Sequence, residues 1–408
     1  MSNRPYPVIT VNEKAARSLR SGHPWVYGAE TDGPDRPCEN GDIVDVVTQK
    51  GRWLGAGFLN DHSKIRVRVI SRNTNDRFDE VFWRRRIQYA LDYRLTVMGP
   101  DFPVSRLIFG EADQFPGLTA DLFQNVLVTE VLSLGMEKVK PILYPLLTEE
   151  LAKRGIAVRA LYERNEAALR EKEGLPREKG FYSLPGLAED PDGHVTITEN
   201  GILYDVDYVN GQKTGFFLDQ KYNRRAAAAL AAGRQVLDCF THTGAFGLNC
   251  ARAGAAHVTS VDISADAVAL TRANIARNGL EDRMEAIQAD VFDLLSDLAR
   301  EKKHPYDFII LDPPAFTKSG ATVKNAYRGY KEINLKAMKL LPRGGYLATC
   351  SCSHFMTADL FCRMLREAAA DAAVGLRQIE DRRQSPDHPI LWGVPETEYL
   401  KFYLFQIV

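Results

Sequence analysis

The chain has 408 residues, of which 45% are hydrophobic and 26% are charged, and its formal net charge at pH 7 is −1. This length predicts two or three domains with full cores, and the composition is that of an ordinary globular protein. A net charge near zero argues against nucleic-acid affinity over the whole surface but leaves room for a local basic patch. No apolar run approaches the roughly 20 residues that span a bilayer, and residues 1–12 lack the pattern of a signal peptide. Six cysteines without framework spacing indicate free thiols, so we expect a cytoplasmic protein with no membrane partner.

Residues 1–75 are expected to form a small β-barrel. Short strand-like runs at 42–47 and 53–59 are separated by glycines. From Lys64 to Val69 the residues alternate strictly, so a strand would bury its apolar residues and present Lys64, Arg66 and Arg68 on the other face. Three cations in a row could contact phosphates. The alternative is a solvated edge strand whose charges discourage aggregation.

Residues 76–192 are expected to form a central α/β domain. The spacing of apolar residues predicts a helix over 79–97 and another over 139–154, with strands between 110 and 134. The sequence does not indicate what this domain binds.

Residues 193–408 begin with two predicted strands joined at Asn200-Gly201, which is typical of a type I′ hairpin. The next turn carries Lys213. This lysine could contact a phosphate or the carboxylate of a cofactor, and a solvent-facing loop lysine is an equally good interpretation.

The stretch from Gln235 to Asp262 predicts a strand, a tight turn, a helix and a second strand that ends in an acid. Such a βαβ unit places its ligand outside the carboxyl ends of the strands, where Asp262 could accept both ribose hydroxyls of an adenosine. A dinucleotide site needs a G-x-G-x-x-G turn, whereas this turn has the single glycine Gly244. The pattern therefore favours S-adenosylmethionine.

Two further strands are predicted to end in acids. Asp290 follows the run 286–289, where it could accept a hydrogen bond from the adenine amino group, and Asp312 follows the continuous apolar run 306–311. Pro313 and Pro314 stiffen the loop after Asp312. A carboxylate fixed beside the cofactor is expected to act as a base or as a substrate anchor.

The run 344–354 predicts a last strand with two cysteines at its end, Cys350 and Cys352. Both could simply pack in the core, and metal binding is disfavoured because the other cysteines are scattered, so no metal is expected. The third interpretation is a nucleophile. Carbon 5 of a pyrimidine becomes nucleophilic enough to take a methyl group after a thiolate adds to carbon 6.

The chain resembles the ribosomal RNA large subunit methyltransferase I family, whose members are class I S-adenosylmethionine-dependent enzymes that form 5-methylcytidine in 23S rRNA. The resemblance covers nearly all 408 residues and rests on SGHPWVYGAE (Ser21 to Glu30), GEADQFPGLTADLF (Gly110 to Phe123), KTGFFLDQKYNR (Lys213 to Arg224), DCFTHTGAFG (Asp238 to Gly247), LDPPAF (Leu311 to Phe316) and TCSCSHFM (Thr349 to Met356). It implies an α/β fold with three parts. These are an N-terminal PUA-like RNA-binding barrel (1–75), a central α/β domain (76–192) and a Rossmann-like methyltransferase domain (193–408).

The resemblance also implies that the FFLDQ segment lies against the cofactor and that the nucleophile lies in the last motif, where Cys352 is preferred to Cys350 and the assignment stays open. Asp312 is expected to anchor the N3 and N4 edge of cytosine or to take the C5 proton. The candidate RNA-binding residues are Lys64, Arg66, Arg68 and Lys213. The expected cofactor-binding residues are Phe217, Asp219, Gln220, Asp238, Phe240, Thr241, Thr243, Gly244, Asp262, Ser264, Asp290, Val291 and Asp312.

The expected reaction is C5-methylation of a cytidine in 23S rRNA or a large-subunit precursor. One alternative is methylation of an exocyclic amine such as guanine N2, which needs no thiol. The other is a non-catalytic RNA-binding assembly factor with a vestigial cofactor fold. The oligomeric state is open, with a homodimer as one option.

Overall fold

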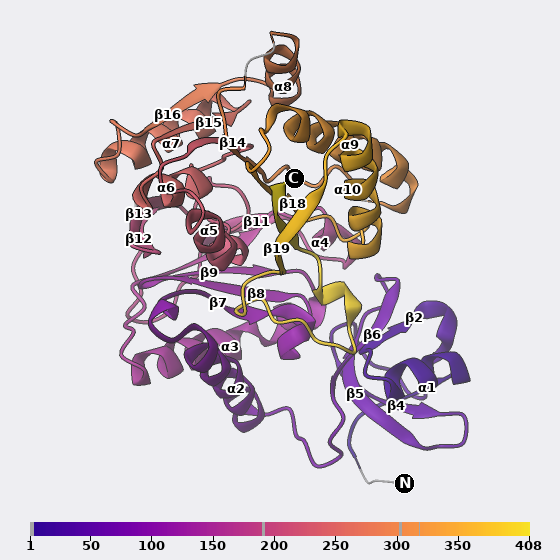
Figure 1. Cartoon of the computed structure of the whole chain (residues 1–408). Helices are drawn as coiled ribbons and strands as arrows, with labels where there is room; N and C mark the ends of the chain where they lie inside the picture. Colours follow the sequence, from indigo (N-terminus) through magenta and orange to yellow (C-terminus); the bar gives the residue numbers. More distant parts are fainter. Residues whose placement is uncertain (1–3, 190–191, 302–303, 318) are drawn as a thin grey trace. The chain divides into compact units, whose positions relative to one another are not determined.

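The computed structural model describes residues 4–189, 192–301, 304–317 and 319–408 (Figure 1). Contacts within the chain divide it into two compact units. The first unit comprises Met1–Ile197, Val206–Leu218 and Pro386–Thr397, and the second comprises Thr198–Asp205, Asp219–Ser385 and Glu398–Val408. The predicted domain boundaries after residues 75 and 192 stay predictions. No helix in the described ranges is long and apolar enough to cross a membrane.

A six-stranded sheet in the order β2-β6-β5-β4-β1-β3 opens the first unit. Its strands are β1 (Val8–Val11), β2 (Trp25–Tyr27), β3 (Thr31–Pro34), β4 (Ile43–Thr48), β5 (Trp53–Leu59) and β6 (Ile65–Ser71), and it carries helix α1 (Glu13–Arg20). The side chain of Asn12 caps α1 by accepting a hydrogen bond from the Ala15 amide. At Gly57 the strands approach so closely that a Cβ atom would lie 2.1 Å from the Arg68 carbonyl oxygen. Only glycine fits there.

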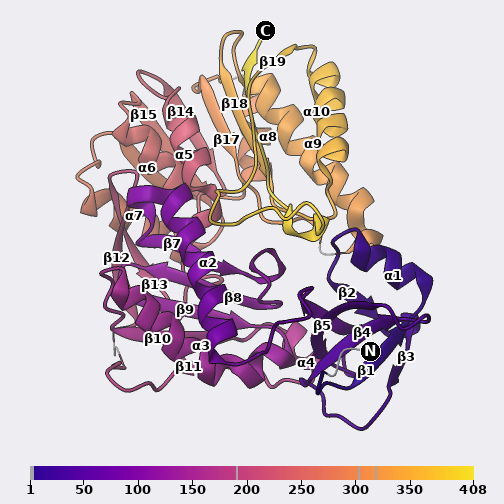
Figure 2. The same ribbon diagram turned by 90° about the horizontal axis from the view of Figure 1, so that it is seen from below.

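A second, five-stranded sheet in the order β11-β10-β9-β8-β7 follows in the same unit. Its strands are β7 (Val104–Phe109), β8 (Leu118–Phe123), β9 (Val126–Val131), β10 (Ala160–Asn165) and β11 (Glu178–Phe181). Helices α2 (Glu80–Met98) and α3 (Leu134–Lys153) pack side by side against it (Figure 2), and α4 (Leu169–Lys172) is a single turn. The prediction of a helix over 79–97 is confirmed within one residue.

The predicted hairpin at Asn200-Gly201 is confirmed, with strands β12 (His194–Glu199) and β13 (Ile202–Asp207). Asn200 and Gly201 have φ angles of 52° and 77°, as a type I′ turn requires.

The second unit is built on a seven-stranded sheet in the order β16-β15-β14-β17-β18-β20-β19. The strands are β14 (Gln235–Cys239), β15 (His257–Asp262), β16 (Met284–Gln288), β17 (Phe308–Leu311), β18 (Tyr346–Ser351), β19 (Leu376–Arg382) and β20 (Lys401–Ile407). β14 to β18 are parallel, and β20 runs antiparallel between β18 and β19. After β14 the chain adds β15 and then β16 on one side of β14, and it then adds β17 on the other side of β14. The strand order therefore reverses between β14 and β17, which is where ligands of such sheets bind.

Helices cover both faces of this sheet (Figure 1). One group comprises α5 (Lys221–Ala228), α6 (Ala245–Arg252) and α7 (Ala265–Arg277), and the other comprises α8 (Val291–Arg300), α9 (Val323–Leu340) and α10 (Ala358–Ala372). The second group and the strands enclose a core that includes Leu311, Tyr330 and Phe361, all fully buried. Short 3-10 turns complete the chain: η1 (Gly28–Glu30), η2 (Gly99–Asp101), η3 (Gly110–Asp113), η4 (Leu218–Gln220), η5 (Gly320–Thr322) and η6 (Pro395–Thr397).

Candidate active site

The strand register brings the predicted polar residues to one edge of the seven-stranded sheet. Val261 pairs with Cys239, and Cys239 pairs with Leu311. Leu311 in turn pairs with Thr349. The residues that follow these four therefore form one row at the carboxyl edge: Asp262, Phe240, Asp312 and Cys350. The row crosses the point where the strand order reverses.

The turn after β14 is held in an unusual backbone conformation. Phe240, His242 and Gly244 all have positive φ angles, of 62°, 53° and 81°. For the two residues with side chains this conformation costs on the order of 1 kcal/mol or more each, and it concentrates at ligand sites. A Cβ atom on Gly244 would lie 2.7 Å from the Thr271 methyl carbon, so glycine is required on both steric and conformational grounds.

The buried side chain of Asp238 holds this turn by hydrogen bonds. Its Oδ2 atom accepts hydrogen bonds from the Thr241 hydroxyl, the Ser260 hydroxyl (3.1 Å) and the Gly247 amide (3.0 Å). Its Oδ1 atom is buried and accepts no hydrogen bond from the described residues. Burial raises the pKa of Asp238 to about 6. A buried carboxylate oxygen without a donor suits a ligand that carries an amino group.

The side-chain carboxylates of Asp262 and Asp290 both accept hydrogen bonds from backbone amides of the loops at this edge. Asp262 accepts from the amides of His242 and Ser264, each at 3.0 Å. Ser264 caps α7. Asp290 caps α8 through its Oδ1 atom, at 2.7 Å from the Phe292 amide. The two carboxylates are half-buried, so they hold the loops and still face solvent.

The remaining predicted residues of this edge are buried. Thr243 accepts a hydrogen bond from Asn274 through its carbonyl at 3.1 Å, and Val291 begins α8. They therefore contribute backbone atoms and shape to the edge rather than charge.

Asp312 stands in a hydrogen-bonded chain. The Gln220 side-chain amide donates to its Oδ1 atom at 3.0 Å, and Asn223 donates to Gln220 at 2.7 Å. Burial raises the pKa of Asp312 to about 7, and the nearby carboxylate of Asp219 acts in the same direction. At neutral pH this carboxyl group therefore exists in both its protonated and its ionised forms.

Asp219 itself is fixed from the last part of the chain. The Tyr399 hydroxyl donates to its Oδ2 atom at 2.6 Å, and the Ser385 amide donates to its carbonyl at 2.8 Å.

Phe217 and Lys213 belong to the first unit, where the Lys213 ammonium lies 4.6 Å from the centroid of the Phe217 ring.

The two cysteines of the last motif differ in their surroundings. Cys350 is fully buried in β18, and this burial raises its pKa well above the ordinary value, with the Asp312 carboxylate adding to the effect. Cys352 lies one residue past the strand end and is half-buried. A neutral buried thiol is inert, whereas a partly accessible sulfur at a strand end can react.

Lys401 is a buried cation that interacts electrostatically with Cys352. It is 3% exposed, and its Nζ atom donates to the carbonyls of Ser353 and Tyr399, each at 2.6 Å. Burial lowers the pKa of Lys401 to about 8, and a negative charge on Cys352 opposes that shift. The ammonium group therefore both fixes the backbone after Cys352 and favours a thiolate there.

The three candidate RNA-binding residues between positions 64 and 68 differ in whether their charges are paired. Arg68 is buried, and its two terminal nitrogens donate to Glu173 at 3.0 and 2.9 Å. Arg66 pairs with Asp61 at 2.7 Å. Lys64 precedes β6 and is exposed. The Glu173 pair gives Arg68 a structural role inside the first unit, so the predicted alternation of exposed cations ends at Arg66.

Sequence reasoning missed Asn223, Tyr399 and Lys401. Lys401 carried a signal, because a charge inside the apolar run LKFYLFQIV breaks the pattern of a buried strand. Asn223 lies inside the motif KTGFFLDQKYNR, whereas Tyr399 carried no signal, since only the fold brings it to the site. In the described ranges no group of three or more His, Cys, Asp or Glu side chains could hold a metal ion.

Two protein-family models match this chain. A PUA-like domain model matches residues 9–72, and an S-adenosylmethionine-dependent methyltransferase model matches residues 179–406. The methyltransferase model covers more than half of the chain, including every residue of the strand-end row.

Curated relatives match along the whole length. A ribosomal RNA large subunit methyltransferase I from Shewanella denitrificans is 43% identical over 389 residues, covering 94% of this chain and 95% of that protein. A protein of the same name from Klebsiella pneumoniae is 36% identical over 410 residues, covering 100% of both.

Among solved structures, a Streptococcus mutans protein classed as a SAM-dependent methyltransferase superposes with a TM-score of 0.81 at 21% identity, covering 98% of this chain and 99% of that one. A methyltransferase-class protein, SMU.776, solved in complex with SAH, gives a TM-score of 0.82 at the same identity and coverage. These likenesses show the fold.

Proposed function

Because the chain belongs to the ribosomal RNA large subunit methyltransferase I family and is an S-adenosylmethionine-dependent methyltransferase, we propose that it forms 5-methylcytidine in 23S rRNA, or in a precursor of the large subunit, through a covalent bond between Cys352 and the cytosine ring. The observation that carries this proposal is a half-buried cysteine, Cys352, one residue past the end of β18, the strand that pairs with the strand leading into Asp312.

The residues around the β14 turn fit the cofactor. Asp262 would accept the ribose hydroxyls and Asp290 the adenine amino group. The Oδ1 atom of Asp238, which accepts no hydrogen bond from the described residues, would accept from the amino group of the methionine tail. Phe240, Thr241, Thr243, Gly244, Ser264 and Val291 would contribute to the same cofactor site, together with Asp219 and Gln220. When bound, S-adenosylmethionine supplies an electrophilic methyl group.

Cys352 would act on the pyrimidine. Its thiolate adds to carbon 6, and the electron pair of the C5–C6 double bond moves toward N3 and makes carbon 5 nucleophilic. After carbon 5 has taken the methyl group, its hydrogen leaves as a proton to a base. The thiolate then departs, and the ring recovers its aromatic character.

Asp312 would hold the N3 and N4 edge of the cytosine. In its protonated form the carboxyl group donates to N3 while its other oxygen accepts from the N4 amino group. Donation to N3 stabilises the charge that develops there when the thiolate adds, and the proton returns to Asp312 when the thiolate leaves. The pKa of about 7, raised by burial, keeps this proton available at neutral pH. The alternative is that ionised Asp312 takes the C5 proton.

Nucleoside analysis tests the product. Large-subunit rRNA incubated with the purified protein and isotope-labelled S-adenosylmethionine is digested and analysed by mass spectrometry. We expect the label in 5-methylcytidine. Label in N2-methylguanosine instead would establish exocyclic amine methylation, and specific RNA binding without any labelled nucleoside would indicate an assembly factor.

Asp262→Asn is expected to weaken cofactor binding about tenfold, because an amide is a poorer acceptor for the ribose hydroxyls than a carboxylate. Isothermal titration calorimetry with S-adenosylmethionine measures the effect. Asp266→Asn is the matched control, since Asp266 is exposed in the first turn of α7. Equal affinities of the two variants would remove Asp262 from the cofactor site.

Lys401→Met is expected to slow alkylation of Cys352 by iodoacetamide roughly tenfold at pH 7, because the ammonium group that favours the thiolate is gone. Peptide mass spectrometry follows Cys352 separately from the other thiols. Lys339→Met, at an exposed site on α9, should leave the rate unchanged. If Lys401→Met reacts as fast as the unmodified protein, Lys401 does not influence the sulfur.

A further inference from the structure

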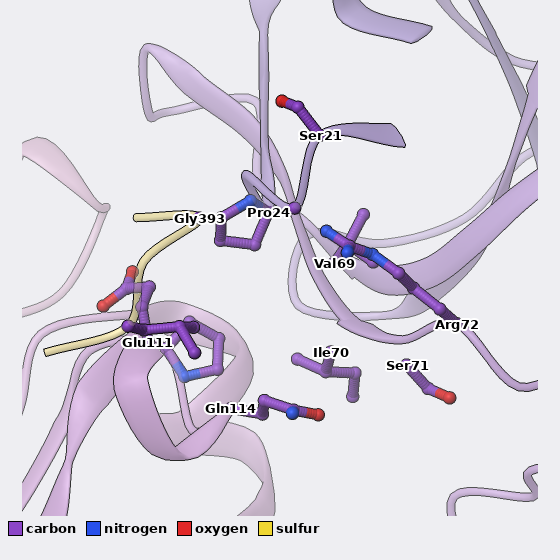
Figure 3. Close-up of a pocket in the computed structure, with 12 residues that line it drawn as sticks. Ser21, Pro24, Val69, Ile70, Ser71, Arg72, Glu111, Gln114 and Gly393 are labelled. Atoms are coloured by element: carbon purple, nitrogen blue, oxygen red, sulfur yellow. The ribbon is translucent and has the colours of Figure 1, made fainter. Parts of the chain in front are cut away.

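The first unit contains a cavity of about 300 Å³ that no part of the proposed reaction uses. Its walls come from the loop after α1, the end of β6, the loop around η3 and the turn at residues 391–394 (Figure 3). Val69, Pro116 and Leu391 give it apolar surfaces, and Ser21, Arg72 and Gln114 give it polar groups. Its volume lies at the lower end of the range for small-molecule sites, which suits one planar ring and its substituents.

A fully exposed tryptophan belongs to one of the segments that line this cavity. Trp392 is 97% exposed, and it lies between two lining residues, Leu391 and Gly393. Single apolar residues on a surface are ordinary, but an indole is large, rigid and frequent at binding hot spots. Because its two neighbours in the chain line a cavity, we consider this exposed indole as part of a binding site.

The turn that carries Trp392 is rigid. The Val394 amide donates to the Leu391 carbonyl at 2.7 Å, and Thr397 binds both ends of the turn, accepting from the Leu391 amide at 2.9 Å and donating to the Val394 carbonyl at 2.7 Å. The turn also packs on the loop after α1, because a Cβ atom on Gly393 would lie 3.0 Å from the Gly22 Cα atom. The indole is therefore presented in a fixed place.

Arg72 supplies a positive charge to the cavity. Its side chain runs from the end of β6 toward Val69 and Pro24 (Figure 3). It forms no ion pair with any described residue, and its Nη2 atom has one long hydrogen bond, 3.4 Å, to the His23 carbonyl. Burial lowers the pKa of Arg72. Arg72 is nonetheless exposed, so its guanidinium group is accessible to an anionic group in solution.

We propose that this cavity and Trp392 form a binding site for a single-stranded segment of the RNA substrate, in which one base stacks on the Trp392 indole and an adjacent phosphate contacts Arg72. Exposed aromatic side chains and arginines together are the means by which proteins bind unpaired bases and the backbone between them, and here both are carried by segments that line one cavity. The neighbouring base enters the cavity, where the Gln114 amide can donate to and accept from its edge. This inference rests on the proposed function only in that RNA is the substrate.

The test is equilibrium binding of a fluorescein-labelled, unstructured 12-nucleotide RNA to the full chain, followed by anisotropy at several salt concentrations. We expect Trp392→Ala to weaken binding about tenfold, the loss of one base stack, and Trp392→Phe to restore most of it. Arg72→Gln should weaken binding and reduce the salt slope by about one, as expected for one lost phosphate contact. Tyr89→Ala is the control, because Tyr89 is 63% exposed on α2 and does not line the cavity.

Two outcomes overturn the proposal. If Trp392→Ala keeps its melting temperature and binds RNA as tightly as the unmodified protein, the indole has no part in RNA binding, and loss of a purified ribosomal protein's binding in that variant would instead assign the site to a protein. If Trp392→Phe fails to restore binding, stacking is not the interaction. Neither result affects the assignment of Cys352, because the assay requires no methyl transfer. Absence of RNA binding by the unmodified protein would contradict the proposed function as well.

Discussion

Cys352→Ala is expected to abolish methyl transfer, by a factor on the order of 10³ or more, because carbon 5 of cytosine cannot take a methyl group at a useful rate without addition at carbon 6. Affinity for S-adenosylmethionine should stay within about twofold, since Cys352 is not among the proposed cofactor contacts. Single-turnover transfer of labelled methyl groups to rRNA and calorimetry measure the two quantities separately.

Cys350→Ala is the matched control for this substitution. Cys350 is fully buried, and its burial raises the pKa of its thiol well above the ordinary value, so it is expected to remain a neutral packing residue. Its replacement should leave turnover within about tenfold of the unmodified protein. The opposite pattern, an inactive Cys350→Ala and an active Cys352→Ala, would exchange the two assignments. Full activity of both single variants and of the double variant would remove covalent catalysis altogether.

Asp312→Asn is expected to lower turnover by about 10² to 10⁴, the usual contribution of a positioned acid or base. Asparagine keeps the shape of the side chain and can hydrogen bond to N3, but it cannot give up a proton. The melting temperature at pH 8 should stay the same or rise, which separates a chemical defect from misfolding. The sign follows from burial, which raises the pKa of Asp312 to about 7. Ionisation above that pH therefore destabilises the folded state, and asparagine removes this cost.

The pH dependence decides between the two roles of Asp312. A carboxyl group that donates to N3 must be protonated, so its contribution to the rate should fall as the pH rises through about 7, the value set by burial. A carboxylate that takes the C5 proton would make the rate rise through the same range. We expect the falling limb, and we expect Asp312→Asn to lack it. Loss of a rising limb in this variant would show that Asp312 is the base.

The strand-end acids could be predicted from the sequence because their signals are local. A buried parallel strand is a short apolar run, and the residue after it must lie at the carboxyl edge of the sheet. Asp262 and Asp312 follow such runs, and the observed register puts both in one row. The single Gly244 in the turn indicated S-adenosylmethionine and not a dinucleotide. This signal is also local, because the number of glycines in the turn limits how closely a pyrophosphate can approach the backbone.

Features that depend on distant contacts could not be predicted. Arg68 looked like an exposed strand cation, but Glu173, 105 positions later, takes up its charge. Helix α3 begins at Leu134, five residues before the predicted start, because Ser133 caps it and the fold tolerates Pro141 and Pro145 inside it. Lys401 reaches the last motif only because β20 pairs antiparallel with β18. The local sequence of either strand does not predict that they pair.

The most direct measurement of the proposed chemistry is a covalent trap. RNA containing 5-fluorocytidine at the target position is incubated with the protein and S-adenosylmethionine, and the products are analysed by tandem mass spectrometry. Fluorine cannot leave carbon 5 as a proton does, so the adduct should persist, with the methylated RNA fragment attached to Cys352. An adduct on Cys350, or methylated RNA with no adduct on either cysteine, would contradict the account.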